Sequence, residues 1–307
     1  MKTILITGGS GLVGRALTKH LLNKGYKVII LTRSAVSKKS TSQISYAEWD
    51  IKKGLIDIEA LQQADFIIHL AGASVIEKKW STAYKKEIIE SRTESSKLLI
   101  NTLKQHPHSV KAIISASATG WYGEDKVPGK YFTETDKPAN DFLGETCKLW
   151  EQSLSAAEEI NIRVCKLRTG IVLSNDGGAF AEFKKPIKLG IAAILGSGNQ
   201  MISWVHIDDL CRMYLYAIEN ANLHGSYNAV APEPVTNKKL TLSIAEKIRG
   251  NFFTPVHVPA IFLKLIMGGR SIEILKSASV SSSKIKETGF TFLYPSIDAA
   301  LNDLIPT

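Results

Sequence analysis

The first fourteen residues, MKTILITGGSGLVG, pass from an apolar run straight into a cluster of glycines. Residues 3–6 are apolar apart from Thr3, as a central parallel strand requires, and residues 12–23 follow with an amphipathic helical pattern. The chain must therefore reverse sharply between a buried strand and a helix, which limits the start of the fold to a strand, a glycine turn and a helix.

The glycines fit two overlapping registers, Gly8-x-x-Gly11-x-x-Gly14 and Gly9-x-Gly11-x-x-Gly14. In such a turn one glycine permits the reversal, one lets the backbone approach a pyrophosphate, and one brings the helix close to the strand. The amide groups at the start of the helix would then face the phosphates. Because a strand precedes the motif and a helix follows it, we predict a dinucleotide site rather than a purely structural turn.

Residues 26–32 form a second β-branched, apolar run and complete a βαβ unit. An NAD-binding unit usually places an acidic residue at the end of this strand, whereas this chain has Thr32-Arg33-Ser34. An arginine can grip a 2'-phosphate through two hydrogen bonds, although a surface arginine at a strand end is the alternative. The sequence thus favours NADP (NADPH) over NAD.

Composition limits the class of protein. The 307 residues suit one large globular unit or two unequal domains. No stretch approaches the ~20 apolar residues of a membrane span, and the start lacks the order of a secretion signal, so we expect a cytoplasmic protein without a membrane partner. The three cysteines are widely spaced, so we expect reduced thiols and no metal site. The net charge of +9 comes from scattered lysine doublets, which favours a solvated surface over nucleic-acid binding.

Strand-like and helical segments alternate through residue 173, with strands at 64–70, 110–115 and 164–168 and helices at 81–104 and 141–159. This alternation predicts an α/β fold with a doubly wound parallel Rossmann sheet and a smaller, mostly helical C-terminal part. We expect an NADP-binding domain at 1–173, to which 203–229 returns. Residues 174–307 would form the substrate or lid region, with a distinct C-terminal domain at about 250–300.

Several segments carry a family resemblance: the Gly8-to-Gly14 turn, SRTESSKLL, SASATGWYG, LRTGIVLSNDGGA, LGSGNQMISWVHIDDL and NAVAPEPVTNKK. Together they resemble the short-chain dehydrogenase/reductase superfamily in its extended, epimerase-like form. More narrowly, they are similar to NADP-binding epimerase-family proteins with a DUF1731-type C-terminal domain. The resemblance covers essentially the whole chain.

The resemblance implies a set of cofactor contacts. The glycine loop would hold the pyrophosphate, Thr32 and Arg33 the 2'-phosphate, and Lys148 the nicotinamide ribose. The implied cofactor-binding residues are Gly8, Ser10, Gly11, Leu12, Val13, Gly14, Thr32, Arg33, Leu70, Ala71, Gly72, Glu87, Arg92, Leu143 and Lys148.

The implied catalytic centre departs from the superfamily. Those enzymes use a serine or threonine together with a tyrosine and a lysine four residues apart, and the lysine lowers the pKa of the phenol that transfers the proton. Ser117 and Lys148 fit the hydroxyl and lysine positions, but Gly144 occupies the tyrosine position. Tyr122, which has a lysine four residues later at Lys126, is a candidate surrogate acid or a structural residue.

Further acid candidates are Glu145, Cys147 and His206, each with a structural alternative. The leading functional hypothesis is an NADP-dependent oxidoreductase or epimerase that transfers hydride to or from a small polar molecule, which includes nucleotide sugars. The rival hypothesis, motivated by Gly144, is an NADP-binding sensor or scaffold with impaired catalysis. We expect a small-molecule substrate, no nucleic-acid partner, and a monomer or homodimer.

Overall fold

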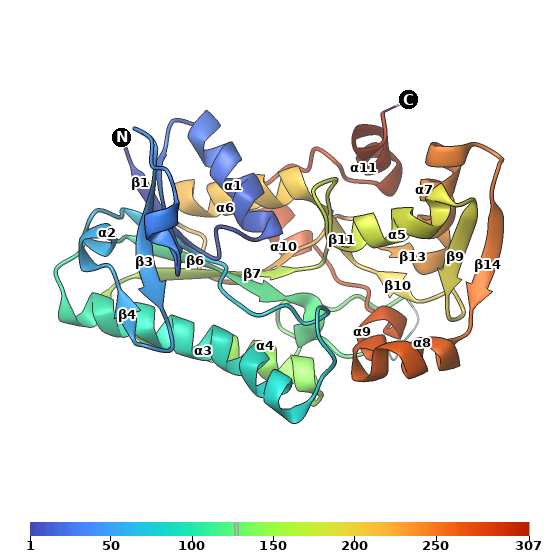
Figure 1. Ribbon diagram of the computed structural model, residues 1–307, viewed down its shortest axis with the longest axis horizontal. Helices are drawn as coiled ribbons and strands as arrows, with labels where there is room; N and C mark the ends of the chain where they lie inside the picture. The colour runs from blue at the N-terminus through green and yellow to red at the C-terminus, as the bar shows by residue number, and fades with distance from the viewer. Residues whose placement is uncertain (126, 128, 307) are drawn as a thin grey trace.

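The computed structural model describes residues 1–125, 127 and 129–306 and is built around an eight-stranded sheet of order β12-β7-β6-β5-β1-β2-β3-β4 (Figure 1). Every pairing in it is parallel except that of β3 with β4. Its strands are β1 (Thr3–Thr7), β2 (Lys27–Thr32), β3 (Ile44–Asp50), β4 (Leu55–Ile56), β5 (Phe66–His69), β6 (Ala112–Ala118), β7 (Arg163–Thr169) and β12 (Gly225–Ala229). The predicted Rossmann-like α/β fold is confirmed.

Helices cover both faces of this sheet because successive strand side chains point to opposite sides. Ile4 and Ile6 of β1 pack with α1 (Leu12–Asn23) and α6 (Ile207–Glu219) on one face. Leu5, between them, faces α3 (Thr82–Gln105) on the other face, where α4 (Phe142–Gln152) also lies against α3. Both faces of the central strands are therefore buried, as their apolar runs predict.

The helix expected over 141–159 is interrupted. Helix α4 ends at Gln152, and a 3₁₀ helix, η3 (Ser155–Ile160), follows it. The hydroxyl of Ser153 donates to the carbonyl of Trp150 at 2.7 Å, and Ser155 donates to Gln152 at 2.8 Å. Serine hydroxyls compete with the backbone for such carbonyls, which accounts for the break.

The C-terminal part holds more strand than the sequence predicts. Three two-stranded sheets pair β8 (Ile171–Leu173) with β11 (Trp204–His206), β9 (Ile191–Leu195) with β14 (Thr254–Val258), and β10 (Met201–Ile202) with β13 (Val235–Thr236). Around them lie α5 (Ala179–Lys188), α7 (Asn237–Arg249), α8 (Ala260–Met267), α9 (Ser271–Leu275), α10 (Ser283–Glu287) and α11 (Ile297–Leu304). The remaining helical turns are α2 (Ile58–Gln62), η1 (Ala35–Ser37), η2 (Thr119–Trp121) and η4 (Gly268–Arg270).

The two parts of the chain interlock. Strand β12, from the later half, pairs with β7 at the edge of the large sheet. The segment after α9 returns to the loop after β6, where Asp125 accepts hydrogen bonds from the amide and hydroxyl of Ser279 at 3.0 and 3.1 Å. The proposed division at residue 173 stays a prediction. Among the described residues, no helix is both long and apolar enough to cross a bilayer.

Candidate cofactor and catalytic site

The glycine turn joins β1 to α1 with almost no free space around its backbone. Gly8 has φ +69°, and a Cβ on it would lie 2.8 Å from the carbonyl carbon and oxygen of Leu70. A Cβ on Gly14 would lie 2.5 Å from the Gly8 oxygen, and one on Gly9 would lie 2.7 Å from a methyl carbon of Ile30. These positions accept only glycine, since the strand ends and α1 are in direct contact there.

Thr7 ties the glycine turn to the end of the neighbouring strand. Its hydroxyl accepts hydrogen bonds from the amides of Leu70 and Ala71, both at 3.1 Å. The same hydroxyl lies 2.8 Å from Nδ1 of His69, which is fully buried. Burial lowers the pKa of His69 to about 4, so this histidine is a neutral structural residue.

The start of α1 is an open anion site. Its N-cap is Gly11, which supplies no side-chain acceptor, and the first turn holds no acidic residue. By contrast, Ser81 caps α3 and Asp141 caps α4 with side-chain oxygens. The first amides of α1 are thus left for an external acceptor, and they fit the pyrophosphate of a dinucleotide. Ser10 and Gly11 are exposed beside them, and Leu12 and Val13 are half-buried.

At the end of β2, Arg33 is exposed and has no ion-pair partner among the described residues. A cavity of about 420 Å³ opens beside it and is also lined by Ser34. Thr32, just before Arg33, accepts a hydrogen bond from the amide of Ser34 at 3.3 Å. The sequence analysis missed a second cation, Arg15, whose Nη1 donates to the carbonyl of Ser10 at 2.6 Å. Its position directly after the last glycine was the available signal.

Of the remaining implied cofactor residues, some make contacts inside the protein and one is exposed to solvent. Gly72 contacts Arg92, since a Cβ on Gly72 would lie 3.1 Å from the guanidinium carbon. Arg92 also stacks on Trp150 at 4.9 Å, and burial lowers its pKa. Leu143 is buried against Gly120, whereas Glu87 is exposed on α3 and makes no hydrogen bond among the described residues. The structure therefore brings Gly72 and Arg92 together and leaves Glu87 in solvent.

Ser117 lies in a buried polar network. Its hydroxyl donates to Glu151 at 2.7 Å, and the side chain is 3% exposed. The carboxylate of Glu151 also pairs with Arg168 through two hydrogen bonds of 2.8 and 3.0 Å and accepts a fourth from Ser226 at 2.8 Å. Burial raises the pKa of Glu151, but these donors outweigh it and leave the pKa lowered, so the carboxylate is charged.

The same network holds Tyr122. Its hydroxyl donates to Asn228 at 2.6 Å and accepts from Arg168 at 3.0 Å, and the residue is 0% exposed. Burial raises its pKa to about 12. Lys126, the partner of Tyr122 in the alternative motif, lies outside the described residues. The catalytic role of Tyr122 stays a prediction, and its surroundings are those of a structural side chain.

Gly144 and Lys148 occupy successive turns of α4. A Cβ on Gly144 would lie 2.2 Å from the carbonyl oxygen of Ala139, so no side chain fits at the tyrosine position. The Gly144 amide donates to Asp141 at 2.7 Å, which caps the helix. Lys148 is half-exposed and lies 3.3 Å from Glu145, an ion pair that exchanges readily with solvent or a ligand.

Cys147 offers no alternative acid, since burial raises the pKa of its thiol to about 12.

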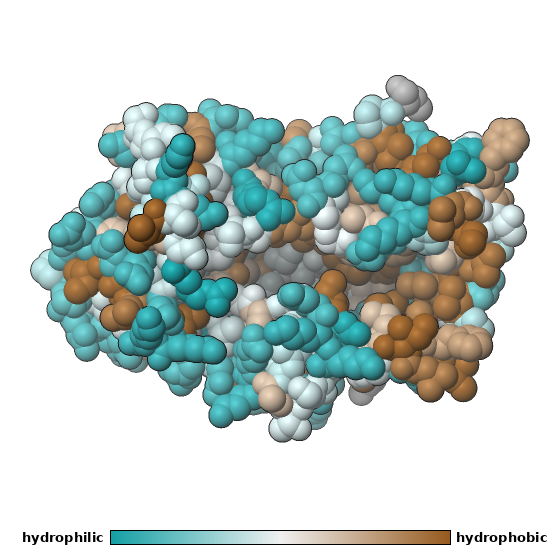
Figure 2. All heavy atoms as spheres, in the orientation of Figure 1, coloured by the Kyte–Doolittle hydropathy of each residue, from teal (hydrophilic) through white to brown (hydrophobic). Residues whose placement is uncertain are grey.

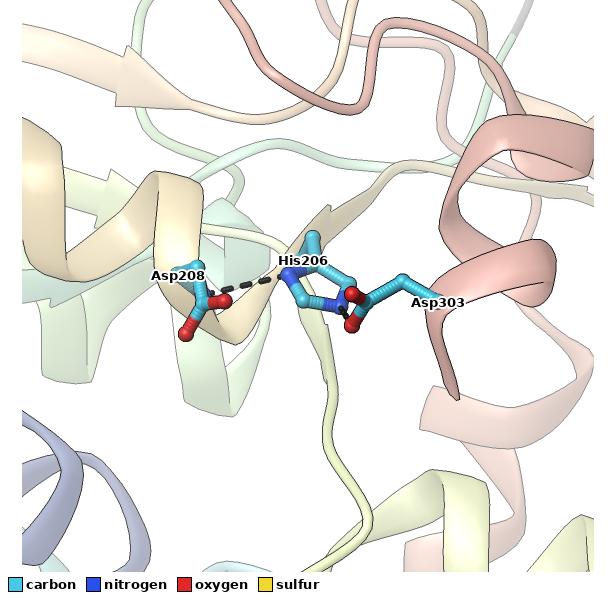
Figure 3. Close-up of side chains that lie close together, drawn as sticks. All are labelled: His206, Asp208 and Asp303. Carbon is cyan, nitrogen blue, oxygen red and sulfur yellow. Dashed lines mark hydrogen bonds and ion pairs between the residues drawn. The ribbon is translucent and has the colours of Figure 1, made fainter. Parts of the chain in front are cut away.

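His206 joins two helices (Figure 3). Its Nδ1 accepts a hydrogen bond from the amide of Asp208 at 3.2 Å and so caps α6, while Nε2 lies 3.3 Å from a carboxylate oxygen of Asp303 on α11. One ligand atom from each of the three side chains lies within 4.8 Å of the others. Because the cap already uses one ring nitrogen and the other faces Asp303, a structural link accounts for His206.

Comparisons with known proteins agree with this geometry. A model of the NAD dependent epimerase/dehydratase family matches residues 4–230, and a domain of unknown function, DUF1731, matches residues 258–304. An epimerase family protein of Staphylococcus haemolyticus is 35% identical over 99% of both chains. A relative from Staphylococcus aureus is also 35% identical, over 99% of both chains.

Solved structures show the same likeness. The human epimerase family protein SDR39U1, solved with NADPH, superposes with a TM-score of 0.85 over 99% of both chains at 26% identity. The nucleoside-diphosphate sugar epimerase of Corynebacterium glutamicum superposes with a TM-score of 0.78 at 32% identity, over 99% of this chain and 58% of that one. The chain described here belongs to the NAD dependent epimerase/dehydratase family.

Proposed function

We propose that this protein is an NADP(H)-dependent oxidoreductase or epimerase that transfers hydride to or from a small polar substrate, with nucleotide sugars as the leading class. The observation that carries the proposal is the glycine turn, which leads into the start of α1, where Gly11 offers no side-chain cap, with Arg33 exposed at the end of β2 and free of ion pairs to the described residues. The NADPH in the human relative and the likeness to the nucleoside-diphosphate sugar epimerase of Corynebacterium glutamicum support it.

In this proposal the bound nicotinamide supplies the hydride chemistry, and the chain supplies position and proton control. Lys148 would leave its weak pair with Glu145 to hold the nicotinamide ribose. As placed, Ser117 donates to Glu151 and keeps only its lone pairs, so it is suited to accept a hydrogen bond from a substrate hydroxyl. Donation to a substrate carbonyl would require the Ser117 hydroxyl to rotate away from Glu151.

Calorimetric titration with NADPH and NADH tests the cofactor choice. Wild type should bind NADPH at least about tenfold more tightly than NADH, because charge-assisted hydrogen bonds to a phosphate are worth about 1.5–3 kcal/mol. Arg33→Ser should remove that preference by weakening NADPH binding alone. Equal binding of the two cofactors by wild type would contradict the assignment of NADP. Oxidation of bound NADPH should then be measured across carbonyl compounds and sugar nucleotides.

A second candidate function is favoured by the packing around Gly144. With the carbonyl of Ala139 filling the tyrosine position and Tyr122 held inside the network, a cofactor-binding sensor or scaffold with little catalysis also fits the geometry. It predicts tight NADPH binding with no substrate-dependent oxidation in the panel. Turnover that is present in wild type and lost in Ser117→Ala would exclude it.

A further inference from the structure

Helix α8 is apolar along nearly its whole length and is exposed on several sides. Its sequence is AIFLKLIM, and Ile261, Phe262, Leu265 and Ile266 are 64%, 54%, 73% and 69% exposed. Within α8 only Leu263 is buried against the body of the protein. Isolated exposed apolar residues need no explanation, but four large ones on one short helix indicate a surface with a partner.

The exposed surface extends beyond one helix. Ile272 of α9, which packs next to α8, is 54% exposed. Figure 2 shows apolar atoms gathered over α8 and α9 at the lower right of the molecule, while the surface to the left is mainly hydrophilic. We call Ile261, Phe262, Leu265, Ile266 and Ile272 the apolar face.

The charges next to the apolar face in the sequence are mainly positive. Residues 251–276 contain Lys264, Arg270 and Lys276, and their one carboxylate, Glu273 on α9, lies 3.8 Å from the ammonium of Lys276. Lys264 is exposed in the middle of α8. The whole chain carries a net charge of +9. An apolar surface edged by cations is complementary to a partner that is apolar inside and negatively charged outside.

We propose that the apolar face binds the surface of an anionic lipid bilayer, with α8 lying in the plane of the interface. In this position the exposed apolar side chains enter the boundary between headgroups and acyl chains, and Lys264 meets the lipid phosphates. A second copy of the chain is a poorer occupant. Two such faces would bring their Lys264 side chains together, and Glu273, the carboxylate that follows Ile272, already pairs with Lys276 at 3.8 Å.

This inference revises one expectation from the sequence. The absence of a membrane partner was expected because no segment is long enough to span a bilayer, but a helix of eight residues that lies on the surface has no such length requirement. The inference does not depend on the proposed function, because no residue of the apolar face is among the cofactor-binding residues.

Flotation with lipid vesicles tests the proposal on the full chain. Wild type should float with vesicles of phosphatidylcholine and phosphatidylglycerol, bind phosphatidylcholine alone less, and lose affinity as salt is raised. Leu265→Asp combined with Ile266→Asp should lower the partition constant at least about tenfold, because a carboxylate is costly in the bilayer and repels anionic lipid. Leu189→Asp combined with Leu293→Asp, at residues 81% and 56% exposed outside the apolar face, adds the same two charges and is the matched control, which should bind vesicles more tightly than the test variant.

The outcomes separate the alternatives. Wild type and both variants should bind NADPH alike, which shows that their folds are intact. Equal vesicle binding by the double variant and wild type would mean that the apolar face does not contact the bilayer, and it would overturn the proposal. No flotation at low salt would overturn it as well. A lipid-free dimer seen by light scattering, abolished by the double variant, would assign the face to a second copy instead.

Discussion

At the scale of single residues, Gly144 shows why the missing tyrosine is not simply restored. Its Cβ position is occupied by the carbonyl of Ala139 at 2.2 Å, so Gly144→Ala should lower the free energy of unfolding by about 1–3 kcal/mol through overpacking. Urea denaturation measures this change. Gly123→Ala is the control, since its Cβ would lie at an ordinary 3.5 Å from the Cβ of Ala139 and should cost within about 0.5 kcal/mol. Equal stabilities of the two variants would show that the turn relaxes freely.

Glu151 makes a second residue-scale prediction. Glu151→Gln leaves the guanidinium of Arg168 buried without a counter-charge, and the free energy of unfolding should fall by about 3–5 kcal/mol at pH 7. Because the folded pKa of Glu151 is lowered, its contribution is present above the unfolded carboxyl pKa of about 4.3 and is lost as the pH falls through the folded value.

The free energy of unfolding should therefore be measured by denaturation at pH 7 and in acid. The difference in this free energy between wild type and Glu151→Gln should be smaller in acid than at pH 7. Glu145→Gln is the matched control, because Glu145 is 50% exposed and its ion pair with Lys148 contributes about 1 kcal/mol or less. A difference for Glu151→Gln that stays constant down to acid pH would contradict the charged state assigned to the carboxylate.

At the scale of elements, His69 links two strands to a helix. Its ring contacts Thr7 of β1 on one side and Ser95 and Ser96 of α3 on the other, at 3.2 and 3.1 Å. Its pKa is about 4 in the folded protein and about 6.5 when unfolded, so the unfolded state binds more protons between these values. Stability should therefore fall by about 3 kcal/mol as the pH drops through this window.

Chemical denaturation between pH 7 and pH 4 checks the His69 prediction. In His69→Asn, which has no group to titrate there, the drop in stability should be smaller than in wild type by about 3 kcal/mol. If His69→Asn and wild type lose the same stability on acidification, the buried ring is not the source.

Elements with a clear period were predictable from the sequence, whereas elements formed by long-range pairing were not. Strands β1, β2, β5, β6 and β7 are buried on both faces. Burial on both faces requires a nearly continuous run of apolar residues, and such a run is visible in the sequence. Residues paired between strands β9 and β14 lie 63 positions apart in the sequence, and β14 is largely exposed. Its residues therefore carry no core pattern that a sequence could show.

The site divides in the same way. The glycine positions were predictable because their backbone geometry excludes other residues. The partner of Ser117 was not, because Glu151 and Arg168 lie 17 residues apart and meet only when α4 packs on the end of β7. Glu151 lies seven residues after Gly144, on the same face of α4, and this spacing was a sequence signal for Glu151. No such signal existed for Arg168.

At the scale of the whole molecule, Asp125 joins the C-terminal segment to the Rossmann part. Its carboxylate accepts hydrogen bonds from the hydroxyl of Ser277 at 2.9 Å and from the amide and hydroxyl of Ser279, and its amide donates to the carbonyl of Ser277. A substitution of Asp125 removes the hydrogen bonds of its carboxylate and leaves the one that its backbone amide makes. This joint positions the segment that follows α9 against the loop that follows β6, beside the end of the strand that carries Ser117.

Asp125→Ala should loosen this joint without unfolding the cofactor site. We expect amide hydrogen exchange across residues 277–281 to accelerate at least about tenfold, because the lost carboxylate bonds are worth about 1 kcal/mol or more each and local opening sets the exchange rate. NADPH binding should be unchanged, since the glycine turn lies on different strands. Asp136→Ala is the control: Asp136 accepts from Thr133 within its own loop, so exchange at 277–281 should stay as in wild type. Unchanged exchange in Asp125→Ala would mean that β12 and its pairing with β7, rather than Asp125, hold the two parts together.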